Sequence, residues 1–139
     1  MKQKILIVDD SDPIRLLIKC FLGSNYEYQE ATNGLEGILR ARQWKPDLIL
    51  LDLEMPELDG IEFLKKLRAD PQPKIAKLRT IMFTTTEREK ESRDVGADDF
   101  IKKPIRPDAL RDVVGRHLDR VGTQTSCEPR LRENKEKPR

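Results

Sequence analysis

The chain has 139 residues, which is the size of one domain, and 37% of them are hydrophobic, enough for a single core. The formal net charge of +2 gives no electrostatic basis for broad nucleic-acid binding, so we expect no direct DNA contact. Neither Cys20 nor Cys127 belongs to a CxxC pair, and no apolar stretch approaches the roughly 20 residues that span a bilayer. Residues 1–20 also lack the order of parts of a signal peptide. These features predict a soluble, cytoplasmic protein with no membrane partner.

The first third of the chain predicts two strands, each followed by a helix. Residues 4–8 form an apolar strand, and Asp12 is placed to cap the next helix with Pro13 at its first position. The residues expected on the buried face of that helix are Ile14, Leu17, Ile18 and Phe21. Residues 26–30 predict a weak strand, and residues 33–44 predict a helix opened by Asn-Gly. The residues expected to point inward from this second helix are Leu35, Ile38 and Leu39.

The same alternation continues through the rest of the domain. The predicted elements are a strand at 47–51, a helix at 60–69, a strand at 80–83, a short charged helix at 87–94, a strand at 99–102 and a helix from about 106–107. Gly96 suits the left-handed C-terminal cap of the short helix. The residues expected to face inward from the two longer helices are Ile61, Leu64 and Leu67, then Leu110, Val113, Val114, His117 and Leu118. Five strands alternating with five helices predict a parallel sheet covered on both faces.

The composition changes after Val121. Residues 122–139 contain Leu131 as their one large apolar residue, together with two prolines and many charges. Such a segment cannot bury enough apolar surface to fold by itself. We therefore predict one domain over residues 1–121 and a charged, disordered tail over 122–139. Three interpretations of the tail stay open: a solvated end, an expression remnant or a binding tail.

Acidic residues follow two of the predicted strands. Asp9 and Asp10 come directly after the first strand, and Asp52 comes at the end of the third. In an open parallel sheet the carboxyl ends of the strands lie at one edge, where ligands bind. Three carboxylates gathered there repel one another, and their oxygens suit a hard divalent cation. The sequence therefore predicts a metal site at this edge of the sheet.

These acidic residues belong to a longer series of motifs. In chain order the series is Asp9-Asp10, Asp52, Met55-Pro56, Asp59-Gly60, Thr84, Gly96-Ala97-Asp98-Asp99-Phe100 and Lys103-Pro104. Each motif alone is unspecific, since an Asp-Gly pair, for example, predicts only a turn. Together, in this order and at strand ends, they resemble the receiver domains of two-component response regulators over about residues 1–121.

The resemblance implies a flavodoxin-like (βα)5 fold, a doubly wound five-stranded parallel sheet with strand order 2-1-3-4-5. It implies that Asp52 accepts a phosphoryl group from a phosphohistidine of a sensor histidine kinase or a histidine phosphotransfer protein. The implied cofactor is Mg²⁺ (or Mn²⁺), held by Asp9, Asp10, Asp52 and the backbone carbonyl of Glu54. Lys103 and Thr84 are the implied contacts to phosphoryl oxygens, and Phe100 is the aromatic that changes position on activation. A cis bond between Lys103 and Pro104 and a downstream target protein are also implied.

Three features depart from the family pattern. The interval from Thr84 to Lys103 is shorter than usual, which predicts a shortened fourth helix and an output surface unlike that of familiar relatives. Thr85 is larger than the residue usual at its position and is expected to narrow access to the phosphoryl group. Glu54 places a carboxylate two residues after Asp52, where it is expected to face the attacking water or a kinase.

Two alternatives were weighed against a response regulator. The first is an enzyme, a phosphohydrolase of the haloacid dehalogenase type, because Asp52-Leu53-Glu54 is similar to its acid-x-acid nucleophile motif. That motif normally follows the first strand of a longer chain, whereas here it follows the third, and no cap domain is available. The second is a receiver-like scaffold that is never phosphorylated, which the filled key positions disfavour. We therefore expect a single-domain response regulator that is not an enzyme. Its output is expected to be protein–protein interaction or onward phosphotransfer in a relay.

Overall fold

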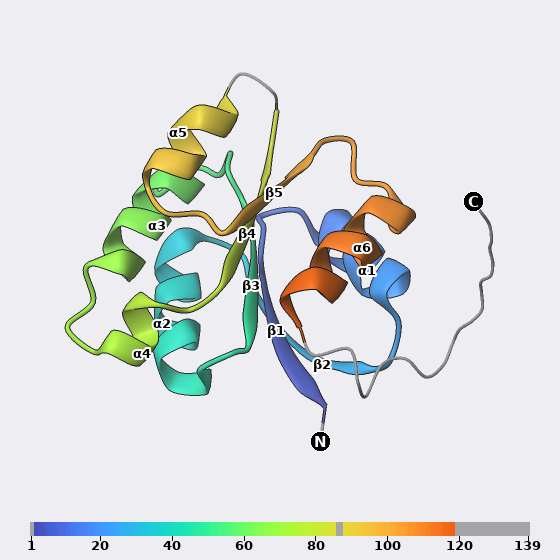
Figure 1. Ribbon diagram of the computed structural model, residues 1–139, viewed down its shortest axis with the longest axis horizontal. Helices are drawn as coiled ribbons and strands as arrows, with labels where there is room; N and C mark the ends of the chain where they lie inside the picture. The colour runs from blue at the N-terminus through green and yellow to red at the C-terminus, as the bar shows by residue number, and fades with distance from the viewer. Residues whose placement is uncertain (1, 86–87, 119–139) are drawn as a thin grey trace.

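The computed structural model describes residues 2–85 and 88–118, and Figure 1 shows their arrangement. Five parallel strands form one sheet in the order β2-β1-β3-β4-β5, which confirms the predicted fold class. The strands are β1 (Gln3–Val8), β2 (Tyr26–Ala31), β3 (Leu48–Asp52), β4 (Thr80–Thr84) and β5 (Asp99–Lys102). The helices in these residues are α1 (Asp12–Leu22), α2 (Gly34–Trp44), α3 (Gly60–Arg68), α4 (Pro73–Ala76), α5 (Glu89–Asp94) and α6 (Pro107–His117). None of them is long and apolar enough to cross a membrane.

Helices cover both faces of the sheet. In Figure 1, α1 and α6 lie on one face, and α2, α3, α4 and α5 lie on the other. Neighbouring residues of a strand point to opposite faces, so Ile5 and Ile7 pack beneath α1 and α6, whereas Leu6 and Val8 pack beneath α2 and α3. The central strand β3 is buried along its whole length. The predicted inward residues that are buried on the longer helices are Ile18, Ile61, Leu64, Leu67, Leu110, Val113, Val114 and Leu118.

The start of α1 differs from the prediction. Its N-cap is Ser11, not Asp12, because the Ser11 hydroxyl accepts a hydrogen bond of 3.3 Å from the amide of Ile14. Asp12 is the first helical residue, where its negative charge is favourable beside the helix N-terminus. The N-caps of α2 and α3 are Asn33 and Asp59, each accepting from a backbone amide of the first turn.

Helix α2 packs through its small residues, and the prediction that Leu35 and Leu39 point inward is wrong. Leu35 is 64% exposed and Leu39 is 55% exposed. The residues of α2 that face the core are Gly34, Gly37, Ile38 and Ala41. A Cβ atom at Gly37 would lie 2.8 Å from the Phe63 ring and 3.1 Å from the Val8 methyl groups. At Gly37 the helix therefore approaches the sheet so closely that no larger side chain fits, and the two leucines turn to solvent.

The region between α3 and β5 contains one helix more than predicted. The extra helix is α4, a single turn that begins at Pro73 and is anchored by Ile75, which is fully buried. Helix α5 corresponds to the fourth predicted helix, and it is short, with six residues, as the short interval between Thr84 and Lys103 predicted. Gly96 lies just after it, with φ of 101°. Such a φ favours glycine, as expected for a residue just past a helix end. Residues 86–87, the predicted boundary at 121 and the predicted tail lie outside the described residues.

Candidate functional site

The predicted site residues lie where neighbouring strands end at one edge of the sheet. Asp9 and Asp10 follow β1, Asp52 is the last residue of β3, and Thr84 is the last residue of β4. Lys103 directly follows β5. Because all five strands run in the same direction, their carboxyl ends form a common edge (Figure 1). The fold thus places at one edge residues that are far apart in the sequence.

Asp9, Asp10 and Asp52 form an acidic cluster, in which one carboxylate oxygen of each lies within 4.8 Å of the others. Asp9 and Asp52 are each 4% exposed, whereas Asp10 is exposed. One oxygen of Asp9 accepts a 2.9 Å hydrogen bond from the amide of Ser11. One oxygen of Asp52 accepts a 3.3 Å hydrogen bond from the amide of Glu54. These bonds orient the two buried carboxylates within the cluster.

Burial makes the charged form of these carboxylates costly. It raises the pKa of Asp9 from 3.8 to about 6, against the hydrogen bond from the Ser11 amide and with further repulsion from Asp52 and Asp10. Burial also raises the pKa of Asp52, although the hydrogen bond and the charge of Lys103 oppose the rise. A divalent cation in the cluster would favour the charged forms and relieve the repulsion.

Lys103 places a positive charge against one of the two buried carboxylates, that of Asp52. Its Nζ donates a 2.6 Å hydrogen bond to Oδ1 of Asp52. The amide of Lys103 donates to the carbonyl of Thr84 at 3.1 Å, which ties the end of β5 to the end of β4. The bond between Lys103 and Pro104 is cis, as the family resemblance implied. The hydrogen bond to Asp52 shows that the Lys103 side chain points from the end of β5 toward the end of β3.

Thr84 is buried at the end of the neighbouring strand. Its hydroxyl donates a 2.9 Å hydrogen bond to the carbonyl of Thr85. In the register of β3 and β4, Asp52 lies opposite Phe83, so Thr84 extends one residue further toward the site edge. The hydroxyl is thus near the acidic edge but is bonded to the backbone of its own loop.

The loop after Asp52 is pressed against the end of β3. The amide of Gly60, the first residue of α3, donates a 2.8 Å hydrogen bond to the carbonyl of Leu53. A Cβ atom at Gly60 would lie 2.8 Å from the carbonyl oxygen of Asp52 and 2.7 Å from Cα of Leu53. Glycine at this position therefore allows α3 to start directly against the site. Glu54, in the same loop, is exposed.

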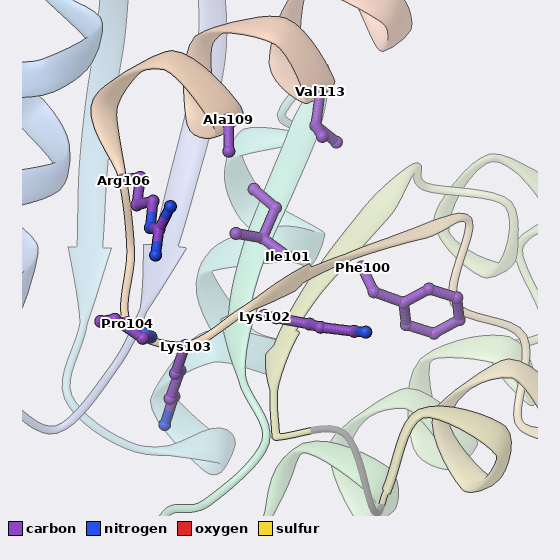
Figure 2. A pocket seen from close by; sticks show the side chains of 8 residues that line it. All are labelled: Phe100, Ile101, Lys102, Lys103, Pro104, Arg106, Ala109 and Val113. Carbon is purple, nitrogen blue, oxygen red and sulfur yellow. The ribbon is translucent and has the colours of Figure 1, made fainter.

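Phe100 lies on β5 away from the acidic cluster. In the register of β4 and β5 it is opposite Met82, two residues before the end of β4. Figure 2 shows the Phe100 ring on the side of β5 opposite to Ile101, which points toward α6. The guanidinium of Arg93 lies 4.5 Å from the centre of the Phe100 ring, over its face. A hollow of about 430 Å³ runs along β5 and the start of α6 (Figure 2).

The donor set of the acidic cluster fits a hard divalent cation. It offers carboxylate oxygens on three side chains, two of them buried with raised pKa values. Carboxylates are the ligands that Mg²⁺ and Mn²⁺ favour, and the cluster carries excess negative charge against the single ammonium of Lys103. Among the described residues, this is the one group of three acidic, histidine or cysteine side chains that could hold a metal ion.

Sequence reasoning missed two features around this cluster. A pocket of about 370 Å³ opens over it, with an apolar rim formed by Ile14, Leu17, Pro104 and Ile105. Leu17 was predicted to face the core, but it is 37% exposed and lines this rim. The second feature is Arg15, which is buried and donates to the backbone carbonyl of Asp9. On α1 it lies on the same buried face as Ile18 and Leu22, and a charged residue at such a position gives no sequence signal of its role.

Comparisons with known proteins agree with this geometry. The family model of the response regulator receiver domain matches residues 5–115. The sporulation initiation phosphotransferase F of Bacillus subtilis is 36% identical over 122 residues, which cover 85% of this chain and 95% of that protein. The transcriptional regulatory protein SrrA of Staphylococcus aureus is 43% identical over 118 residues, 82% of this chain but 46% of that protein. A methylesterase of Methanospirillum hungatei matches over only 34% of its length.

Solved structures of receiver domains are also similar to this chain. The chemotaxis response regulator CheY4 of Vibrio cholerae superposes with a TM-score of 0.77 at 33% identity, covering 85% of this chain and all of that chain. The receiver domain of a signal transduction histidine kinase from Syntrophus aciditrophicus superposes with a TM-score of 0.76 at 32% identity, covering 93% of this chain and 98% of that chain. Sheet order, site placement, family match and relatives converge, and the chain belongs to the receiver domains of two-component response regulators.

Proposed function

We propose that Asp52 is the phosphoryl acceptor of this receiver domain. The observation that carries the proposal is the set of charged groups around the buried carboxylate of Asp52. The ammonium of Lys103 lies 2.6 Å from it, and the carboxylates of Asp9 and Asp10 lie beside it. Phosphoryl transfer depends on positioning and on neutralising the phosphoryl oxygens more than on acid–base chemistry. A strand-end carboxylate between a fixed cation and a metal-binding cluster meets that need.

The proposed reaction moves a phosphoryl group from a phosphohistidine to Asp52. A carboxylate oxygen of Asp52 attacks phosphorus in line with the leaving imidazole, and the bond between phosphorus and the histidine nitrogen breaks with its electron pair going to the ring. The product is an acyl phosphate on Asp52, and the donor leaves as a neutral imidazole because its other ring nitrogen carries a proton during the transfer. Lys103 exchanges its bond with Asp52 for one to a phosphoryl oxygen, so its charge stays close to the new anion.

Asp10 and Asp52 would hold Mg²⁺ together with the backbone carbonyl of Glu54, and Asp9 would orient a metal-bound water. When bound, the cation neutralises charge on the phosphoryl oxygens. Backbone amides of the chain orient the carboxylates: the Ser11 amide holds Asp9, and the Glu54 amide holds Asp52.

Phosphorylation would then change the surface of the domain through Thr84 and Phe100. The Thr84 hydroxyl, now bonded to the Thr85 carbonyl, would turn to a phosphoryl oxygen. This turn would alter the surface beside β5, where Phe100 stacks with Arg93 on helix α5. The two arrangements form a two-state equilibrium that the phosphoryl group biases. The output is contact with a downstream protein, in a cytoplasmic relay that starts at a histidine kinase or phosphotransfer protein.

Acetyl phosphate with MgCl2, followed by intact mass, tests the acceptor. The wild-type chain should gain the mass of one phosphoryl group, and Asp52→Asn should gain none because an amide is a poor nucleophile. Asp47→Asn is the matched control, since Asp47 is exposed and precedes β3, the same strand that Asp52 ends. Normal labelling of Asp52→Asn would refute the assignment. Repeated turnover of an external phosphoester, in place of stoichiometric labelling, would instead point to a phosphohydrolase.

A further inference from the structure

The side chain of Arg15, on α1, is 7% exposed and lies beneath the loop that follows β1. Its Nη1 donates a 2.6 Å hydrogen bond to the backbone carbonyl of Asp9, and its Nε donates a 2.8 Å bond to Glu30. Its Nη2 contacts the carboxylate of Asp12. The second oxygen of Glu30 is held by Lys19 at 2.5 Å. A rigid guanidinium thus links α1 and the end of β2 to the first residue of the acidic loop.

The bond to the Asp9 carbonyl restrains the segment that carries two of the three acidic side chains. The peptide unit between Asp9 and Asp10 is planar, so fixing the carbonyl oxygen of Asp9 also fixes the direction of the Asp10 amide. On its other side, the Asp9 amide donates to the carbonyl of Ala31 at 3.0 Å. The backbone of Asp9 is therefore held from β2 and from α1, and Asp10 extends from this fixed point into solvent.

Such a restraint is needed because the cluster repels itself. Repulsion among Asp9, Asp10 and Asp52 favours any loop conformation that moves the exposed Asp10 away from its neighbours. A cation site of this type requires the opposite, namely carboxylates that stay converged before the ion arrives.

We propose that Arg15 is a positioning residue of the divalent-cation site: by holding the Asp9 carbonyl, it keeps Asp9 and Asp10 in the arrangement that binds Mg²⁺. This inference rests on the proposed function, since it assumes that the cluster binds a cation. Arg15 acts through the backbone and not through its charge, which the carboxylates of Glu30 and Asp12 balance. A role through charge and a role through the backbone predict opposite changes in Mg²⁺ affinity when Arg15 is replaced. Removing a nearby positive charge strengthens cation binding, whereas releasing the loop weakens it.

The experiment is an amide NMR titration of the full chain with MgCl2, comparing wild type with Arg15→Met and Arg15→Lys. Methionine fills the buried space of the Arg15 side chain but has no hydrogen-bond donors. Lysine keeps the charge but lacks the planar guanidinium that bonds to both Asp9 and Glu30. Both variants should bind Mg²⁺ about tenfold or more weakly, the usual effect of losing a group that orients a metal ligand. Dispersed amide signals identify the variants that are folded. One folded variant is enough to test the effect of Arg15 on Mg²⁺ affinity.

Arg68→Met is the matched control. Arg68 also bonds backbone carbonyls, those of Ala76, Leu78 and Gly96, but at the opposite edge of the sheet. It should destabilise the fold and leave the Mg²⁺ affinity within about twofold of wild type, because distant sites act independently. An unchanged or tighter affinity in a folded Arg15 variant would overturn this proposal alone. A wild-type chain with no Mg²⁺-dependent shifts near Asp10 would overturn the cation site itself.

Discussion

Asp9 is expected to destabilise the metal-free protein at neutral pH. Folding raises its pKa from 3.8 to about 6, because the carboxyl is buried beside Asp52 and Asp10. Each tenfold change in proton affinity is worth about 1.4 kcal/mol, so the rise corresponds to about 3 kcal/mol. Between about pH 4 and pH 6 the folded state binds this proton more tightly than the unfolded chain does. The free energy of unfolding therefore falls as the pH rises through this window, and the loss is complete above it.

Asp9→Asn removes the charge and keeps the oxygen that accepts from the Ser11 amide. In EDTA, the variant should be more stable than wild type by about 2 to 3 kcal/mol at pH 8 and nearly equal to it at pH 4. Urea unfolding followed by circular dichroism across this range measures the difference, and subtracting wild type cancels the contributions of groups common to both proteins. Millimolar Mg²⁺ should narrow the gap at pH 8, because the cation stabilises wild type by binding its folded state. A gain that does not depend on pH, or a loss at pH 8, would refute the reasoning.

Three further predictions concern the loops around the site and the opposite edge of the sheet. Glu57 has φ of 68°, a left-handed conformation that asparagine adopts more readily, so Glu57→Asn should raise the free energy of unfolding by about 0.5–1 kcal/mol; a loss would contradict this reading of the loop. Arg68→Met should lower the free energy of unfolding, measured in urea, by about 3 kcal/mol, since three backbone carbonyls lose a charged donor. Thr85→Ala should shorten the life of the phosphorylated protein, followed by intact mass, if Thr85 shields the acyl phosphate; an equal or longer life would show that it does not.

The strand ends were the most predictable part of the molecule. An apolar run that stops at an acidic residue, as at Asp9 and at Asp52, marks both a buried strand and its carboxyl end. Parallel pairing then brings those ends to one edge whatever the loops between them do. The cluster of Asp9, Asp10 and Asp52 could therefore be predicted before any side-chain packing was known.

The face of helix α2 was not predictable from hydrophobicity alone. A leucine face at Leu35 and Leu39 is the usual signature of a buried stripe, yet the helix buries Gly37 and Ala41. The helix lies so close to Phe63 and Val8 that a Cβ atom at Gly37 would clash with them. Arg15 was missed for a different reason. Its role depends on a backbone carbonyl of Asp9, and a carbonyl carries no sequence signal.

Two arginines, Arg15 and Arg68, act at opposite edges of the sheet. At the carboxyl edge, the buried carboxylates with raised pKa values reduce stability when no cation is bound. At the amino edge, Arg68 joins the end of α3 to the segments that enter β4 and β5, through the carbonyls of Leu78 and Gly96. An edge tied in this way can hold the strands in register while the other edge keeps repelling charges together. Specific bonds therefore hold both edges: Lys103 to Asp52 and Arg15 to the Asp9 carbonyl at the acidic edge, and Arg68 at the other.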